Sequence, residues 1–380
     1  MLGAGTLAQA ASTVMNTGPA FLIPSLVSDE GLTLAEAGLV AGAPVAGGAC
    51  TLVAWGLLCD RRGERLTLLA GLVATALLGV AAAYAGGPAV LALALFLAGA
   101  ASTSTSAASG RVVIGWFPPR RRGLAMGIRQ TSTPVGVGIA AATMAVTADR
   151  FGPYAALWVP VVACTIGALA VALLVVDPPR PPGGPAAAPN PYRGDRYLLR
   201  IHGVSVLLVV PQFAVWTFAL VWLVHDRGWS PAAAGGLVAF AQVAGALGRI
   251  AAGQLSDVVG SRMRPLRWVT LAAAATMLTL GVTAGLGWVL AVPLVVVATV
   301  VTVADNGLAF TAVAERAGPF WSGRALGIQN TTQFLAASAV PPLAGLAVTQ
   351  SGYGAMFALT ALFPLVALAL VPVSGERAFR

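Results

Sequence analysis

The chain alternates between long apolar stretches and short polar segments throughout its length. Twelve of the stretches extend over about 20 residues or more, and at 1.5 Å per residue a helix of that length crosses a hydrocarbon core of roughly 30 Å. The pattern predicts twelve membrane-spanning helices near residues 4–27, 34–58, 66–86, 88–116, 123–147, 153–177, 201–224, 231–255, 266–287, 289–314, 323–347 and 354–373.

One longer polar segment divides this series in two. Residues 178–200 contain the sequences PPRPPGG, APNP and YRGDR, and Pro and Gly at this density oppose a packed element. We therefore predict an all-α membrane protein with an N-terminal six-helix bundle over 1–177, a cytoplasmic linker over 178–200 and a C-terminal six-helix bundle over 201–380.

The amino-acid composition also indicates a protein that lies in a membrane. Of the 380 residues, 58% are hydrophobic and 9% are charged, whereas about a quarter of the residues in a soluble domain are charged. Such a chain cannot cover a surface that faces water, so a soluble enzyme is excluded.

The formal net charge of +9 comes from arginine, because the chain has no lysine. If the N-terminus is cytoplasmic, the outside segments hold only Arg150 and Arg227. The inside segments hold Arg61, Arg62, Arg65, Arg120, Arg121, Arg122, Arg180, Arg193, Arg196, Arg200, Arg262, Arg264, Arg267, Arg316, Arg324, Arg377 and Arg380. This asymmetry predicts a plasma-membrane protein with both termini in the cytoplasm, and it explains the charge without a nucleic-acid partner.

The three cysteines, Cys50, Cys59 and Cys164, are scattered in or beside the predicted spans. Their spacing predicts neither a disulfide framework nor a metal site, and we expect no cofactor. The first apolar segment lacks a basic leader and reaches spanning length, so we expect it to remain as a helix.

The sequence contains two copies of a loop motif. Gly56, Asp60, Gly63 and Arg65 follow the second span, and the equivalent residues after the eighth span are Gly253, Asp257, Gly260 and Arg262. The offset between the copies is 197 positions. Internal repeats at a long fixed spacing are the signature of duplicated architecture.

A second repeated motif lies where the fifth and eleventh spans begin. The sequence RGLAMGIRQT occupies residues 122–131, and SGRALGIQNT occupies residues 322–331, at an offset of 200. Two unrelated motifs at nearly the same offset predict a duplicated protein. Its two halves would be related by an approximate twofold axis along the membrane normal.

These residues resemble the major facilitator superfamily. Its signature between the second and third helices, Gly-x-x-x-Asp-Arg-x-Gly-x-Arg, is met by Gly56, Asp60, Arg61, Gly63 and Arg65, whereas the second copy has Val258 in place of the first Arg. The resemblance implies the major facilitator fold and secondary active transport by alternating access.

In that family the repeated loops hold the cytoplasmic ends of the two halves together and release them as the carrier turns inward. By resemblance, Asp60 and Asp257 would face the starts of the eleventh and fifth spans, and Glu315 would meet Arg262 or Arg264. We expect Arg111 to join this network, although it could instead snorkel to the interface. The candidate latch residues are Gly56, Asp60, Arg61, Gly63, Arg65, Arg111, Gly253, Asp257, Gly260, Arg262 and Glu315.

Three ionisable residues, Arg129, Arg249 and Asp305, fall inside predicted spans, where a charge is costly and indicates function. Each lies about 10–15 Å from the nearest cytoplasmic charge at the helical rise. Arg129 and Arg249 would come from opposite halves and could close on one anion. Asp305 would pair with Arg249 in the empty site or take up a proton. The position of Arg249 resembles that of the helix 8 Arg of monocarboxylate and oxalate–formate carriers.

A purely structural alternative remains open, in which Arg249 and Asp305 form a permanent pair and Arg129 reaches cytoplasmic water. Other polar residues in the spans are candidates for substrate contact or for interhelical hydrogen bonds. The further candidate substrate contacts are Asn16, Gln212, Trp216, Gln242, Gln329, Asn330 and Gln333.

We therefore expect a monomeric carrier of a small organic anion, a carboxylate, that works as a proton-coupled symporter or as an antiporter and contacts membrane lipid. The alternative is a proton-coupled drug or metabolite efflux pump, which the absence of a Gly-Pro pair in the fifth span disfavours. A third hypothesis is a receptor or enzyme on a carrier-like scaffold. No nucleophile–base pair, phosphate loop or metal cluster is evident in the sequence, so we expect no enzymatic activity.

Overall fold

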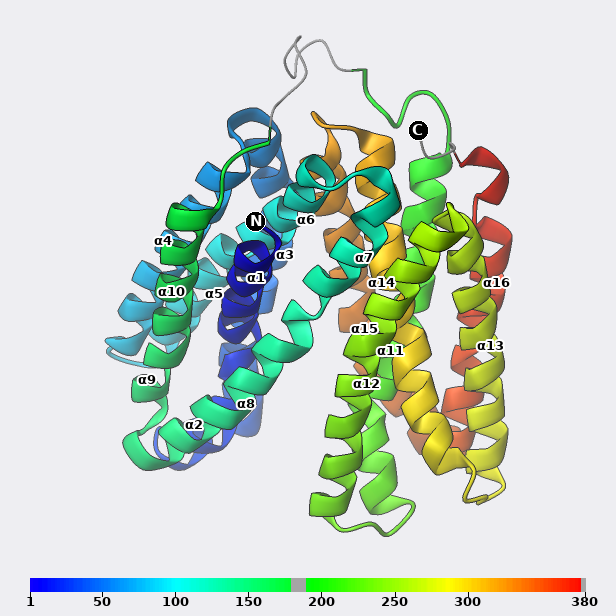
Figure 1. The fold of residues 1–380 in the computed structure, drawn as a ribbon. Coiled ribbons are helices and arrows are strands. Elements are labelled where there is room, and N and C mark those ends of the chain that lie inside the picture. The colour runs from blue at the N-terminus through cyan, green and yellow to red at the C-terminus, as the bar shows by residue number, and fades with distance from the viewer. Residues whose placement is uncertain (179–188, 377–380) are drawn as a thin grey trace. The chain divides into compact units, whose positions relative to one another are not determined.

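In the computed structural model, residues 1–178 and 189–376 are described, and these residues form helices and no strand (Figure 1). The elements are α1 (Leu2–Thr17), η1 (Gly18–Leu22), α2 (Ile23–Ser28), α3 (Leu34–Arg62), α4 (Glu64–Ala83), α5 (Pro88–Ser102), α6 (Ser104–Trp116), α7 (Pro119–Gln130), α8 (Ser132–Phe151), α9 (Pro153–Ala156), α10 (Trp158–Leu174), α11 (Tyr197–His225), α12 (Pro231–Val259), α13 (Met263–Gly285), α14 (Ala291–Ala317), α15 (Ser322–Thr360), α16 (Leu362–Leu370) and η3 (Val373–Gly375). The predicted all-α fold class is confirmed.

Ten helices in the described ranges are long and apolar enough to cross a membrane, compared with twelve predicted spans. The first predicted span is interrupted, because Gly18 and Pro19 begin a 3-10 turn between α1 and α2. The last two predicted spans fall within one continuous helical stretch, Ser322–Gly375, that bends at Gly352, where φ is 80°. These two features account for the difference.

The described chain forms two compact units. The first unit comprises Met1–Trp116, Thr131–Pro189 and Ala317–Thr331, and the second comprises Phe117–Gln130, Asn190–Arg316 and Thr332–Arg380. Residues 179–188 of the linker, including Arg180, and the terminal Arg377 and Arg380 lie outside the described residues. The division into halves at 177 and 201 stays a prediction.

The first unit is built by close packing of small residues. Methyl groups added at Gly47 and Gly99 would approach the backbone oxygens of Phe96 and Pro44 to 1.9 and 2.0 Å, so α3 and α5 contact each other through their glycines. Helix α1 packs against α8 and α10, and these three helices enclose buried residues such as Val14, Met144 and Cys164. Helix association in lipid depends on such close contacts because no hydrophobic force brings the helices together.

The second unit has an aromatic core between α11, α13 and α15. Trp222 is fully buried, and its ring meets that of Phe357 edge-on at 6.1 Å. The segment before α11 is fixed by Tyr192, whose hydroxyl lies 3.0 Å from His202 Nε2. Burial raises the pKa of Tyr192 to about 12, so its hydroxyl keeps its proton.

Candidate functional site

Helices α7 and α12 contact each other within the second unit at Gly123 and Gly253. A methyl group at Gly253 would lie 2.1 Å from the Gly123 oxygen, and one at Gly123 would lie 2.3 Å from the Gly253 oxygen. The first unit repeats this crossing between α3 and the start of α15, where a methyl group at Gly56 would lie 2.3 Å from the Gly323 oxygen. Only glycine permits backbones this close.

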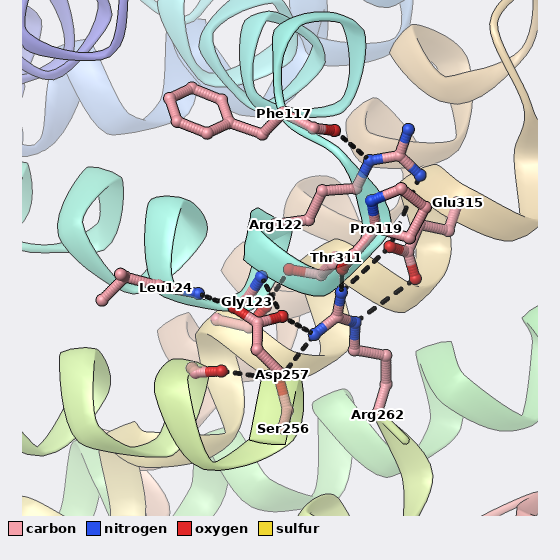
Figure 2. Close-up of polar contacts among 12 residues, drawn as sticks. Phe117, Pro119, Arg122, Gly123, Leu124, Ser256, Asp257, Arg262, Thr311 and Glu315 are labelled. Atoms are coloured by element: carbon pink, nitrogen blue, oxygen red, sulfur yellow. Dashed lines mark hydrogen bonds and ion pairs between the residues drawn. The ribbon is translucent and has the colours of Figure 1, made fainter. Parts of the chain in front are cut away.

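The side chain of Asp257 lies on this crossing in the second unit, as Figure 2 shows. Its two carboxylate oxygens accept hydrogen bonds from the backbone N–H groups of Gly123 and Leu124, at 3.0 and 2.8 Å. These N–H groups belong to the fifth and sixth residues of α7, near the N-terminal end of the helix. The partial positive charge of a helix N-terminus stabilises an anion there.

Arg262 connects Asp257 to the end of α14 (Figure 2). Its guanidinium forms an ion pair with Asp257, donates to Ser256 and to the backbone oxygen of Pro119, and lies 3.2 Å from Glu315 Oε1. Arg122 also approaches Glu315, at 3.6 Å. The resemblance implied a contact of Glu315 with Arg262 or Arg264, and the structure provides the one with Arg262.

Asp60 occupies the equivalent position in the first unit. It is fully buried, and it accepts from the backbone N–H groups of Gly323 and Arg324 at 2.9 and 3.0 Å and from Arg324 Nε at 2.9 Å. Arg111 completes the cluster with an ion pair to Asp60 at 2.9 Å. Buried charges of this kind are stable only when they are paired and hydrogen-bonded.

Arg111 is buried with an exposed fraction of 4% and does not snorkel. Besides Asp60 it forms an ion pair with Glu64 at 3.0 Å, and it donates to the backbone oxygens of Cys59 and Pro319. Sequence reasoning missed Glu64 and Arg324, although Glu64 lies inside the loop motif and Arg324 inside the second repeat. A buried arginine such as Arg111 requires an acid of this kind.

Each loop motif contains a glycine with a positive φ angle. Each motif also donates hydrogen bonds to an acidic residue from the end of its own half. Gly63 and Gly260 have φ of 103° and 68°, which other residues rarely adopt. Asp177 accepts from Arg65 N–H at 2.8 Å, and Glu376 accepts from the Ser261 hydroxyl and the Arg262 and Met263 N–H groups. The guanidinium of Arg65 donates to the Ala172 oxygen at 2.7 Å, whereas Arg61 is exposed. Sequence reasoning missed both acids.

The three ionisable residues inside the spans all belong to the second unit and are almost fully buried. Their exposed fractions are 3% for Arg129 on α7, 3% for Arg249 on α12 and 2% for Asp305 on α14. A methyl group at Gly127 would lie 2.6 Å from the Arg249 oxygen, and one at Gly307 would lie 3.7 Å from the Gly127 Cα atom. The three helices therefore meet within one turn of these side chains.

Arg249 and Asp305 are not joined by an ion pair in the described part of the chain. Arg249 Nη1 and Asp305 Oδ1 are buried and have no hydrogen-bond partner. Arg129 donates to Gln130 Oε1 at 3.1 Å, and its guanidinium lies 5.7 Å from the centre of the Phe310 ring. The structural alternative, in which Arg249 and Asp305 form a permanent pair, stays a hypothesis.

A chain of buried amides crosses from α15 to α14 and α11 in the same unit. Gln333 Nε2 donates to Asn306 Oδ1 at 3.3 Å, and Asn306 Nδ2 donates to Gln212 Oε1 at 3.1 Å. Trp216 lies one turn beyond Gln212, and its ring packs against Phe213 at 5.3 Å. Asn306 was missed from the sequence, although it directly follows Asp305 in an apolar span.

Three of the other predicted contact residues belong to the first unit. Asn16 Oδ1 accepts from the Ser102 hydroxyl at 2.9 Å in the first unit. Asn330 and Gln329, also in the first unit, are buried, and Asn330 donates to the Leu326 oxygen of its own helix. Gln242 on α12 is half-buried. The second unit by itself thus holds the three ionisable residues and the amide chain.

Comparison with known proteins gives a consistent result. The sequence model of the Major Facilitator Superfamily matches residues 5–341. The chain is 48% identical over 367 residues to the uncharacterized MFS-type transporter Rv2994 of Mycobacterium tuberculosis, covering 96% of this chain and 82% of the relative. It is also 25% identical over 248 residues to the hexuronate transporter of Bacillus subtilis, covering 62% of this chain and 59% of that protein.

Among solved structures, the fold is similar to that of the transporter FucP in its outward conformation, with a TM-score of 0.79. The sequences are 14% identical, and the alignment covers 99% of each chain. At this identity the similarity concerns the fold alone.

Proposed function

Because this chain belongs to the Major Facilitator Superfamily and is a multi-pass secondary transporter, we propose that it carries a small organic anion, a carboxylate, by alternating access. The family and the fold are those of transporters rather than enzymes. The cargo is a small molecule, and its transport is coupled to protons or to exchange of a second anion.

The buried guanidinium of Arg249 in the second unit carries this proposal. Arg129, Arg249 and Asp305 are all buried on helices that meet at Gly127, and Arg249 Nη1 has no hydrogen-bond partner among the described residues. An uncompensated arginine inside a membrane costs several kcal/mol. A bound carboxylate supplies the missing negative charge.

Arg249 is the principal anion contact in this proposal. Its Nη1 atom has no hydrogen-bond partner among the described residues, and the guanidinium fork matches the two oxygens of a carboxylate. Arg129 adds a second positive charge from α7, where its contact with Phe310 holds the guanidinium on the α14 side. The arrangement favours a single anion over a cation or an apolar molecule.

Asp305 provides the coupling site. Its Oδ1 atom is buried without a hydrogen-bond partner among the described residues, and a carboxylate with an unsatisfied oxygen in a low-dielectric region is stabilised by a proton or a nearby cation. In proton-coupled transport, Asp305 takes a proton when the anion occupies Arg249. If the carrier instead exchanges one anion for another, Asp305 stays ionised near Arg249 and competes with the anion for the guanidinium.

The hexuronate transporter of Bacillus subtilis supports the same substrate charge, because a hexuronate is a carboxylate. The loop clusters supply the conformational part of the cycle. Asp60 and Asp257 each hold the N-terminal part of a helix, and we propose that these contacts form in one state of the carrier and break in the other.

A thermal-shift screen tests the substrate class. The purified carrier is heated with small carboxylates, with organic amines and with hydrophobic drugs at matched concentrations. A ligand that binds only the folded state raises the melting temperature. The proposal predicts stabilisation by carboxylates that is lost in Arg249→Gln. Stabilisation by amines or drugs, with none by any carboxylate, would contradict it.

A further inference from the structure

One face of α11 carries hydrogen-bond donors that the protein does not use. Gln212 and Trp216 are four residues apart and therefore share a face of the helix. Gln212 is 5% exposed, and the Nε1 atom of Trp216 is buried without an acceptor. Both residues belong to the same unit as Arg249 and Asp305.

The amide chain fixes which way Gln212 points. Its Oε1 atom accepts from Asn306, whose amide nitrogen also approaches the Val303 oxygen at 3.4 Å. Asn306 Oδ1 in turn accepts from Gln333. The oxygen of Gln212 is therefore occupied, and its amide nitrogen donates to no residue in the described ranges. The nitrogen of Gln212 and the indole of Trp216 form a pair of unused donors on adjacent turns.

Trp222 shows why the position of Trp216 matters. Its Nε1 atom is also buried without an acceptor. Its ring, however, is fully enclosed by apolar side chains and by Phe357, and Arg227 covers it at 4.9 Å. Trp222 is thus a packing residue. Trp216 is half-buried and lies one turn from an amide that is held in place by two other helices.

We infer that Gln212 and Trp216 bind hydroxyl oxygens of the substrate, so that the transported anion is a hydroxylated carboxylate. This inference rests on the proposed function, because Arg249 binds the carboxylate group itself. A hydroxyl oxygen accepts hydrogen bonds from the free amide and indole donors, and its proton can be given to the Oε1 atom of Gln333. An aliphatic substrate chain would bury these two donors without offering them a hydrogen-bond acceptor, which is costly.

The position of the amides agrees with this division of roles. Asn306 directly follows Asp305 on α14 and donates to Gln212, so the amide chain begins beside one of the charged residues. Asn306 and Gln333 act as positioning residues, since they orient Gln212 through its oxygen. Selectivity for hydroxyl groups arises because the donors are left unpaired with any other ligand.

Isothermal titration calorimetry with two six-carbon monocarboxylates tests the inference. D-gluconate carries hydroxyl groups on its chain, and hexanoate carries none. We expect the wild-type carrier to prefer gluconate on the order of a hundredfold. Trp216→Phe should weaken gluconate binding about five- to tenfold through loss of one donor and leave hexanoate binding unchanged. Gln212→Leu should reduce the preference further.

Trp222→Phe is the matched control, because it removes the same N–H group from the same helix. It should lower the melting temperature without changing the ratio of the two affinities. The inference is overturned if the wild type binds both acids equally, if Trp216→Phe weakens both equally, or if Trp222→Phe changes the ratio as much as Trp216→Phe.

Arg249→Gln separates this inference from the proposed function. In one outcome, Arg249→Gln abolishes binding of both acids although the wild type shows no preference for gluconate. That result would support the proposed anion carrier and contradict the inferred hydroxyl contacts. If the wild type binds neither acid, both proposals fall. A circular-dichroism spectrum and a cooperative melting transition for each variant establish that it is folded.

Discussion

Asp60 and Asp257 each accept hydrogen bonds from two consecutive backbone N–H groups near the N-terminal end of a helix, Asp60 on α15 and Asp257 on α7. Beneath each carboxylate, two glycines bring the helix backbones into contact. The crossings match residue for residue: the Leu52 oxygen lies 2.7 Å from a methyl group added at Gly327, and the Arg249 oxygen lies 2.6 Å from one added at Gly127. One copy thus places a leucine where the other places an arginine.

Replacing Asp60 by Asn should slow transport more than it weakens binding. The change leaves Arg111 paired with Glu64 and removes the negative charge from the start of α15. Because the cluster biases a conformational equilibrium and does not contact substrate, we expect the maximal rate to fall about tenfold or more with the Kd changed by less than about twofold.

Uptake rates and equilibrium binding measured on the same preparation check this, with the exposed Asp29→Asn as control. Parallel losses of rate and affinity would show that Asp60 acts on the substrate site and not on the equilibrium.

Gly253→Ala should destabilise the carrier, since the added methyl group would lie 2.1 Å from the Gly123 oxygen. Overpacking of this kind costs about 1–3 kcal/mol. Gly235→Ala is the matched control on the same helix, because a methyl group there would meet no atom within 4 Å. Melting temperatures of the two variants check the prediction, and equal values would count against a tight crossing of α7 and α12.

Glu376→Gln should loosen the start of α13. The carboxylate of Glu376 accepts from the Ser261 hydroxyl and from the N–H groups of Arg262 and Met263, so its neutralisation removes a cap worth about 0.5–2 kcal/mol. Hydrogen exchange of the amides of residues 261–263 should become faster in this variant and remain unchanged in the control Ser374→Ala, at an exposed neighbour. Unchanged exchange in both variants would mean that the cap contributes nothing.

Arg129→Gln should weaken anion binding about tenfold without abolishing it, because the variant loses a nearby charge while Arg249 remains. The control is Arg121→Gln, which neutralises an exposed arginine on the same helix. The Kd for a transported carboxylate in both variants checks this. An Arg129→Gln carrier that binds as tightly as the wild type would remove Arg129 from the site.

The helices were predictable because a membrane imposes its own length and polarity on every span. The exceptions depend on backbone geometry. Gly18 and Pro19 begin a 3-10 turn that interrupts the first predicted span. The last two predicted spans belong to one helical stretch that bends at Gly352. Neither the 3-10 turn nor the bend changes the hydropathy of the chain, so the pattern of apolar residues does not predict them.

The candidate site was predictable where a charge interrupts an apolar span, as at Arg249 and Asp305. Asn306 was not predictable, because its amide partners lie 94 and 27 positions away along the chain and are brought together only by folding. Asp177 and Glu376 stand outside the repeated motifs. Their spacing of 199 positions nevertheless falls between the two repeat offsets, and this would have identified them as a third pair.

Uptake of a carboxylate by proteoliposomes that contain Arg249→Gln tests the central claim most directly. The control is Arg267→Gln, at an exposed arginine on α13. The account predicts that Arg249→Gln is folded but has lost uptake by about a hundredfold or more, because an ionic hydrogen-bonded contact in a buried site is absent, and that Arg267→Gln transports as the wild type does. Retained uptake in folded Arg249→Gln would contradict the account.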